Sequence, residues 1–193
     1  MDTALRIAVP EDGAACAAVY APYVADTIIS FEMVPPTAEE MAARIVKTLP
    51  DYPWLIAEAG GAVAGYAYAS QHHARAAYRW GADVGVYLAE AARGQGVGKR
   101  LYTALLALLK AQGYETAYGG ISLPNPASIA LHEGLGFTPV GVYARTGYKM
   151  GAWRDVGWWQ LALGGAVGDP PAEPVPFAEF RRRPGWDACL SGA

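Results

Sequence analysis

A chain of 193 residues has the length of one ordinary domain and can bury a core without disulfides or a structural metal. Its hydrophobic fraction of 53% against 17% charged residues indicates a globular protein rather than a disordered one. The formal net charge of -3 argues against broad binding to nucleic acid or to anionic membranes, which needs a basic face. We therefore expect a small molecule or a protein chain as the partner.

The sequence carries no sign of a membrane segment or a metal site. The stretch "MDTALRIAVPEDG" has no basic region followed by a long apolar one, and no later run approaches the length of a membrane span. We interpret the chain as cytoplasmic. Its cysteines and histidines have no metal-ligand spacing, so we expect inert thiols and no metal; these residues are Cys16, Cys189, His72, His73 and His132.

The first half of the chain predicts a strand, two helices and a hairpin. "ALRIAV" is a short apolar strand, and Pro10 to Asp12 introduce an alanine-rich helix that runs to about Asp26. "PPTAEEMAARIVKTLP" predicts a second helix, in which Thr37 and Glu40 have the spacing of a capping box. "PWLIAEAGGAVAGYAYAS" predicts two strands joined by a tight turn at its paired glycines.

The second half predicts a crossover followed by a hairpin. "GADVGVYLA" is a strand, and the glycine-rich run "RGQGVGKR" leads from it into a leucine-rich helix that Gly113 ends. "TAYGGIS" then predicts a strand, "NPASIALHEGLGF" a helix, and "PVGVYARTGYKMGAWRDVGWWQLAL" a long closing hairpin. The order predicts a mixed α/β domain, with one strand-turn-helix-strand crossover inside an otherwise antiparallel sheet.

Beyond residue 164 the composition changes. Four prolines lie between residues 170 and 176, so we divide the chain into a domain at 1–164 and a Pro-rich C-terminal tail at 165–193. An extended segment lying on the domain or on a partner subunit is one interpretation of the tail, and a specific binding role is the other.

The glycine turn between strand and helix is the main functional signal. Such a turn directs several backbone N–H groups and the positive end of the helix dipole at one point, which favours a phosphate. A Walker loop is excluded because Arg93 stands at its first glycine and Arg100 follows its lysine. A dinucleotide fingerprint is excluded because Lys99 stands at its third glycine. The pattern that remains is Arg93-x-x-Gly96-x-Gly98, and an ordinary glycine-rich loop is the alternative.

The stretch "VYLAEAARGQGVGKRLY" resembles the acetyl-CoA binding motif of the GNAT N-acetyltransferase superfamily, Gln/Arg-x-x-Gly-x-Gly/Ala. The stretches "ISFE", "HARAAYRW", "ISLPNPASIALHEGLGF" and "GYKMGAWRDVGWWQL" resemble, in the same order, the phosphinothricin N-acetyltransferase family. This resemblance covers roughly residues 4–163. It implies an α/β (α+β) GNAT acyl-CoA N-acyltransferase fold, whose mixed, mostly antiparallel central sheet is flanked by helices, with acetyl-CoA as cosubstrate and a homodimer as the assembly.

The resemblance also implies a site for coenzyme A. The strand before the glycine turn would pair with the pantetheine arm, the turn would hold the pyrophosphate, and Lys99 or Arg100 would meet the remaining phosphate. The residues predicted to bind the cofactor are Val86, Tyr87, Leu88, Arg93, Gly94, Gln95, Gly96, Val97, Gly98, Lys99, Asn125 and Ser128.

Two residues are predicted to be catalytic by the resemblance. Asp83 stands where the family carries the glutamate that accepts a proton from the substrate ammonium; its shorter side chain suggests a bridging water. A solvated acid at a strand start is the alternative. His132, seven residues after Asn125, would protonate the departing thiolate or bind the substrate. A half-buried helix histidine is the alternative for it.

The acceptor implied by the resemblance is the α-amine of a small amino acid such as phosphinothricin, methionine sulfoximine or methionine sulfone. Arg75 would bind its carboxylate through a bidentate fork, with Phe31 and Tyr78 lining the pocket. An acetyltransferase for another amine, such as a protein N-terminus or a polyamine, is one alternative. A non-catalytic acyl-CoA-binding sensor is the other, favoured by the departure at Asp83.

Overall fold

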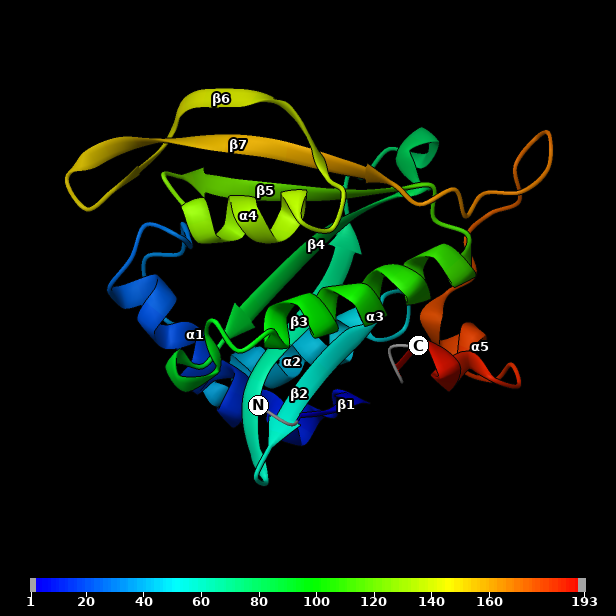
Figure 1. Ribbon diagram of the computed structural model, residues 1–193, viewed down its shortest axis with the longest axis horizontal. Helices are drawn as coiled ribbons and strands as arrows, with labels where there is room; N and C mark the ends of the chain where they lie inside the picture. The colour runs from blue at the N-terminus through cyan, green and yellow to red at the C-terminus, as the bar shows by residue number, and fades with distance from the viewer. Residues whose placement is uncertain (1–2, 191–193) are drawn as a thin grey trace.

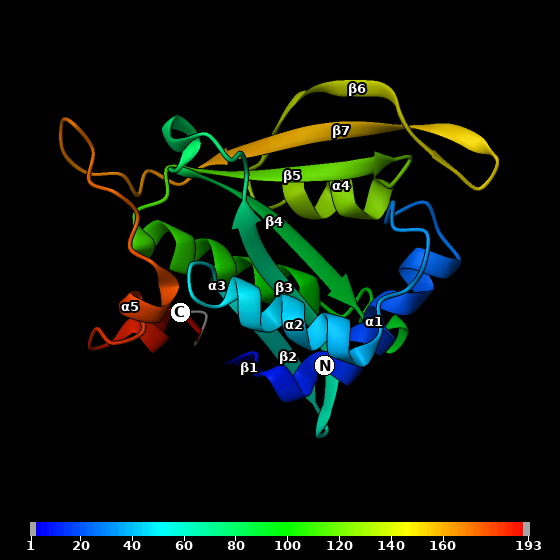
Figure 2. The same cartoon turned by 180° about the vertical axis from the view of Figure 1, so that it is seen from behind.

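The structure is a computed structural model that describes residues 3–190. One seven-stranded sheet is covered by helices on both faces (Figures 1 and 2). Its strands are β1 (Ala4–Ile7), β2 (Trp54–Ala59), β3 (Ala62–Gln71), β4 (Gly81–Leu88), β5 (Thr116–Leu123), β6 (Thr138–Lys149) and β7 (Ala152–Ala162). Its helices are α1 (Gly13–Ala25), α2 (Ala38–Thr48), α3 (Val97–Gln112), α4 (Pro126–Glu133) and α5 (Phe177–Phe180). Within this range no helix is long and apolar enough to cross a membrane.

The strand order confirms the predicted mixed sheet. The strands lie in the order β1-β2-β3-β4-β5-β7-β6, and every neighbouring pair is antiparallel except β4 and β5. The parallel pair is joined through α3, as the crossover pattern predicts. Gly60 and Gly61 both have positive φ, 58° and 79°, and form the predicted tight turn between β2 and β3.

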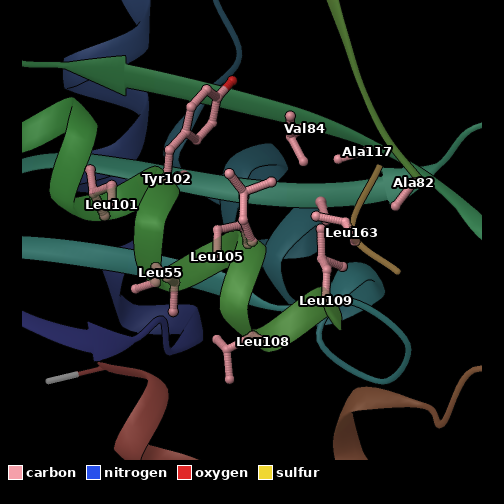
Figure 3. Close-up of a cluster of buried hydrophobic side chains, with 14 of the residues drawn as sticks. Leu55, Ala82, Val84, Leu101, Tyr102, Leu105, Leu108, Leu109, Ala117 and Leu163 are labelled. Atoms are coloured by element: carbon pink, nitrogen blue, oxygen red, sulfur yellow. The ribbon is translucent and has the colours of Figure 1, made fainter. Parts of the chain in front are cut away.

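Two apolar clusters fix the helices to the sheet. On one face, the leucine stripe of α3 packs on small side chains of β4 and β5, such as Ala82 and Ala117 (Figure 3). On the other face, α1 and α2 pack on Trp54 and Tyr66, and Cys16 lies in this cluster. Burial raises the pKa of the Cys16 thiol to about 12, which keeps it protonated and inert.

The central feature of the sheet is a split between its two parallel strands. β4 pairs with β5 only from Gly81 to Asp83, opposite Thr116 to Tyr118. Beyond this point β4 stays with β3 and β5 stays with β7, so the two strands diverge (Figure 1). The backbone edges that face the gap have lost their neighbour, which leaves hydrogen-bonding groups available to a ligand.

The C-terminal segment belongs to the same core. The boundary predicted at residue 164 does not coincide with a break in packing, because Phe177 and Phe180 are buried in the α3 cluster. Val175 and Gln112 exchange two hydrogen bonds: the Val175 N–H donates to the Gln112 carbonyl at 2.7 Å, and Gln112 Nε2 donates to the Val175 carbonyl at 2.9 Å. The Pro-rich stretch is therefore a strap that covers the end of α3.

The loop between α1 and α2 is fastened to its surroundings by charged groups. Lys149, at the end of β6, is buried and its Nζ donates to the Val24 and Ser30 carbonyls at 2.6 and 2.7 Å. Arg44 of α2 donates two hydrogen bonds, of 2.7 and 2.8 Å, to the Glu32 carboxylate. Phe31 lies between these anchors, so its position is set by both helices and by β6.

Candidate active site

The glycine turn exposes backbone donors at the start of α3. Gly96 is the N-cap of the helix with φ of 80°, and Gly94 has φ of 72°, backbone that favours glycine. No described side chain caps this helix, so the first-turn N–H groups of residues 97–99 have no acceptor. A Cβ on Gly94 or Gly96 would meet no atom within 4 Å. The turn is therefore open, uncapped and electropositive, as a phosphate cradle requires.

The basic residues of the turn have different partners. Arg100 donates to the Thr3 hydroxyl, whereas Lys99 is exposed. Arg93 places its guanidinium 4.7 Å from the centre of the Tyr23 ring. Of the two cations predicted to meet a phosphate, Lys99 is thus the one that the fold leaves in solvent beside the turn.

The strand edge predicted to bind pantetheine is only partly open. The Leu88 N–H and carbonyl both bond the Tyr23 hydroxyl, at 3.1 and 2.7 Å. Because backbone groups alternate in direction along a strand, those of Tyr87 point to β3, while those of Val84 and Val86 point into the split. The prediction for Val86 is compatible with this geometry. Because the Tyr87 groups face β3 and those of Leu88 are bonded to Tyr23, cofactor binding by these two residues stays a prediction.

Asn125 has a structural task. Its side-chain oxygen accepts the Ser128 N–H at 3.1 Å and caps α4. The Ser128 carbonyl in turn accepts a hydrogen bond from His132. Both residues predicted to contact the cofactor from this helix therefore serve first to shape its N-terminal turn.

Asp83 lies at the point where the sheet splits, and its partner is a residue that the sequence did not single out. It is the last residue of β4 that pairs with β5. Its Oδ1 lies 2.6 Å from His72 Nδ1. Burial raises the pKa of the Asp83 carboxyl, and the hydrogen bond to His72 opposes that rise. One signal in the sequence pointed to His72: it lies two residues after Ser70, so in an extended strand both side chains lie on the same face. The β3–β4 register, which places Ser70 opposite Asp83, could not be predicted from the sequence.

The register also shows which face of the sheet Asp83 occupies. Ser70 is directly opposite Asp83, and Tyr66 is directly opposite Tyr87, so all four side chains share the face covered by α1 and α2. A cavity of about 400 Å³ lies on this face and is lined by Tyr68, Ser70 and Tyr87 among others. The carboxylate thus stands at the split, beside a tyrosine-rich hollow.

His132 lies on the opposite face, beneath β5. It is 3% exposed, and a Cβ on Gly119 would be only 2.5 Å from its Nε2. Its Nδ1 is 2.8 Å from the Ser128 carbonyl, which can only accept, so Nδ1 carries the proton. Nε2 then accepts from the Tyr102 hydroxyl at 3.3 Å. Burial lowers the pKa of His132, so the ring is neutral and holds no second proton to donate.

The three predicted acceptor residues lie on different segments. Phe31 packs its ring on Gly147 of β6. Arg75 and Tyr78 lie in the segment after β3, where Arg75 is exposed and Tyr78 contacts the His73 ring edge-on at 4.7 Å. None of the three lines the 400 Å³ cavity. Tyr78 does line a smaller one of about 170 Å³ with His72 and Tyr118.

Comparison with known proteins agrees with this geometry. The family model for the acetyltransferase (GNAT) family matches residues 23–137. A phosphinothricin N-acetyltransferase of Streptomyces viridochromogenes is 38% identical over 171 residues, which is 89% of this chain and 93% of the relative. An L-methionine sulfoximine/L-methionine sulfone acetyltransferase of Pseudomonas aeruginosa is 32% identical, over 84% of this chain and 96% of the relative.

A solved structure is similar over nearly the whole fold. The phosphinothricin acetyltransferase of Sinorhizobium meliloti, solved with acetyl-CoA, superimposes with a TM-score of 0.85 and 37% identity, covering 91% of this chain and 96% of that one. The split sheet, the uncapped glycine turn and these matches have one explanation: the chain belongs to the GNAT family of acetyltransferases.

Proposed function

We propose that this enzyme transfers acetyl from acetyl-CoA to the α-amine of a small amino acid of the phosphinothricin, methionine sulfoximine or methionine sulfone type. The observation that carries the proposal is the half-buried Asp83 carboxylate at the mouth of the split, where an acceptor amine would meet the acyl donor. The relatives named for phosphinothricin and for methionine sulfoximine and sulfone support this substrate class.

The residues present fit acetyl-CoA. Backbone N–H groups of residues 97–99 would hold the pyrophosphate, Lys99 a further phosphate, and the backbone of Val84 and Val86 the pantetheine arm. When bound, the cosubstrate supplies the activated thioester. The open space around Gly94 and Gly96 supports this fit, because a pyrophosphate must approach the backbone closely.

Asp83 acts as the general base in this proposal. One carboxylate oxygen is bonded to His72, and the other accepts a proton from the acceptor ammonium, directly or through one water. The neutral amine would then attack the thioester carbonyl. As the carbon–sulfur bond breaks, the second nitrogen proton would pass through water to the departing thiolate, which gives the amide and free coenzyme A. On the other face of the split, His132 holds the Tyr102 hydroxyl by hydrogen bonding and does not act as a protonated acid.

The acceptor carboxylate binds Arg75 in this proposal. The Arg75 side chain makes no hydrogen bond or ion pair within residues 3–190, so its fork is free for an incoming anion. Phe31 and Tyr78 would line the acceptor from the α1–α2 loop and from η2 (Ala76–Tyr78). A free amino acid therefore has a cationic partner that a simple amine would leave unused.

A homodimer completes the proposal. β6 is an edge strand whose side chains are almost all exposed, including Val140 at 58%, Val142 at 56% and Tyr143 at 60%. An uncovered apolar edge strand of this length can pair with a second strand or pack against a second sheet. We assign it to a second copy of this chain, and light scattering at micromolar concentration tests the assignment, with Val142→Lys expected to yield monomers.

A thiol-release assay over a panel of acceptors tests the activity. The panel contains phosphinothricin, methionine sulfoximine, methionine sulfone, their carboxamides, a polyamine and a peptide with a free N-terminus. We expect turnover of the free amino acids and at least tenfold lower kcat/KM for the carboxamides, because these lose the charge-assisted fork. Equal rates for acids and amides would refute the substrate class, and acetyl-CoA binding without turnover of any amine would favour a sensor.

A further inference from the structure

The ring of His72 is held in one orientation by its neighbours. It stacks on Tyr118 of β5 with ring centres 4.0 Å apart and planes 13° from parallel. His73 contacts it at 4.2 Å, and Trp158 of β7 meets it nearly edge-on at 5.9 Å. The His72 side chain is only 15% exposed. Stacking and burial therefore fix the direction of its ring nitrogens.

That direction places Nδ1 on the proposed base. Nδ1 lies 2.6 Å from Asp83 Oδ1, a short distance for a nitrogen–oxygen hydrogen bond to a charged group. A carboxylate can only accept, so the proton lies on Nδ1. Within residues 3–190, Oδ2 of Asp83 has no hydrogen-bond partner, which leaves it for the acceptor amine. His72 therefore holds Oδ1, and Oδ2 is left to accept a proton from the acceptor amine.

The charged and titratable groups around His72 come from β4, β5 and η2 and from the loops next to β3 and β5. Asp83 faces it from β4, Tyr118 from β5, Tyr78 from η2 and His73 from its own segment. Glu115, just before β5, lines the same 170 Å³ cavity as His72. Among the described residues, no lysine or arginine lines that cavity, and the side-chain hydrogen bond to the Asp83 carboxylate comes from His72 Nδ1.

We propose that His72 is the positioning residue of the base: its Nδ1–H anchors the short Asp83 side chain with Oδ2 turned to the acceptor amine. This inference rests on the proposed function. Aspartate has one methylene less than the glutamate that the family resemblance implies here. The orientation of its carboxylate therefore depends on a hydrogen bond from another residue. The hydrogen bond also stabilises the charged carboxylate in a half-buried place, which keeps it able to accept a proton.

Three variants test the proposal through the pH dependence of kcat/KM. His72→Phe keeps a ring to stack on Tyr118 but removes the donor, and His72→Asn keeps a donor near the place of Nδ1. His73→Phe is the comparison variant, because His73 contacts the His72 ring and acts on the Asp83 carboxylate only through its charge, without a hydrogen bond. Losing the bond raises the pKa of Asp83, so the acidic limb of the profile moves to higher pH.

For His72→Phe we expect this limb to move up by about one unit and kcat/KM near neutral pH to fall about tenfold, with the KM for acetyl-CoA unchanged. The Asn variant should recover most of both losses. His73→Phe removes only a weaker charge effect on Asp83, so its limb should move less than that of His72→Phe. A limb at the parent position in a folded His72→Phe variant overturns the proposal, as does a His73→Phe limb that shifts equally.

A second measurement on the unaltered protein covers the case in which His72→Phe does not fold. ¹⁵N NMR of labelled histidines should show the His72 ring with a proton on Nδ1, and Asp83→Asn should change that signal. A ring protonated only on Nε2 overturns the proposal. Failure of the parent to acetylate any amino acid would refute the proposed function instead, and the NMR result would still report on the pair.

Discussion

Replacing Gly119 by alanine tests the buried histidine on the far side of the split. Gly119 lies on β5 with φ outside the positive range, so the backbone itself accepts alanine. The new Cβ, however, would lie 2.5 Å from His132 Nε2 and 2.7 Å from its Cδ2. The ring has no free space to enter, because it is 3% exposed and packed between Tyr102 and Phe137.

The cost follows from two effects of this clash. Overpacking a filled core costs about 1 to 3 kcal/mol. Moving the ring also breaks its bonds with the Ser128 carbonyl and the Tyr102 hydroxyl, and each buried polar group left without a partner costs about 1 to 3 kcal/mol. We expect Gly119→Ala to lower the free energy of unfolding by about 3 kcal/mol or more, and kcat to fall about tenfold or more because the displaced ring no longer holds the Tyr102 hydroxyl.

Urea unfolding and the thiol-release assay measure the two effects separately. Gly141→Ala on β6 is the matched control, because its φ is also ordinary and its Cβ would meet no atom of the same chain within 4 Å; since β6 is the proposed dimer edge, both variants are compared in the monomeric Val142→Lys background. The control should keep the parent stability within about 0.5 kcal/mol. Parent stability and parent kcat in Gly119→Ala would show that the His132 ring is not confined as described, and the argument for its neutral, hydrogen-bonded state would fail.

Three further substitutions test the other parts of the site. Gly96→Ala should weaken acetyl-CoA binding at least tenfold by calorimetry, whereas Gly61→Ala, at nearly the same φ and also in open space, should pay the same backbone strain and leave binding unchanged. Arg75→Ala should raise the KM for amino acids about tenfold or more without changing that for acetyl-CoA; an unchanged acceptor KM would rule out the carboxylate fork. Lys149→Met removes the cation that fastens the loop carrying Phe31, so the acceptor KM should rise and the unfolding free energy should fall by about 2 kcal/mol; a parent-like KM would show that the loop keeps its place unaided.

The elements were predictable because each carries a local signal. The capping box of α2 forms as predicted, with the Glu40 N–H donating to the Thr37 hydroxyl at 3.2 Å, and Gly113 ends α3 with φ of 99°. The glycine turn was likewise predictable, since positive φ and an uncapped helix start leave a pattern in the sequence.

The partners of the site residues were not predictable, because they depend on register and on contacts between distant segments. His72 meets Asp83 only through the β3–β4 pairing, and the Tyr23 hydroxyl bonds Leu88 from 65 residues away. The depth of His132 follows from β5 passing directly over its ring at Gly119, which the spacing from Asn125 does not reveal. Motifs thus predicted the place of the site, and tertiary contacts determine which partners each side chain has there.

The docked C-terminal strap has a consequence for how the protein is made. Phe177 fills the core beside α3. Next to Tyr78 in the chain, Arg79 forms an ion pair with Glu173 of the strap, and Trp80 donates a hydrogen bond to the Ala172 carbonyl. A chain that emerges from the ribosome N-terminus first can form most of its sheet before these residues exist outside the tunnel. The apolar end of α3 stays uncovered until residues 175–186 have emerged, so premature termination near residue 170 leaves a domain with exposed apolar surface rather than a slightly shorter enzyme.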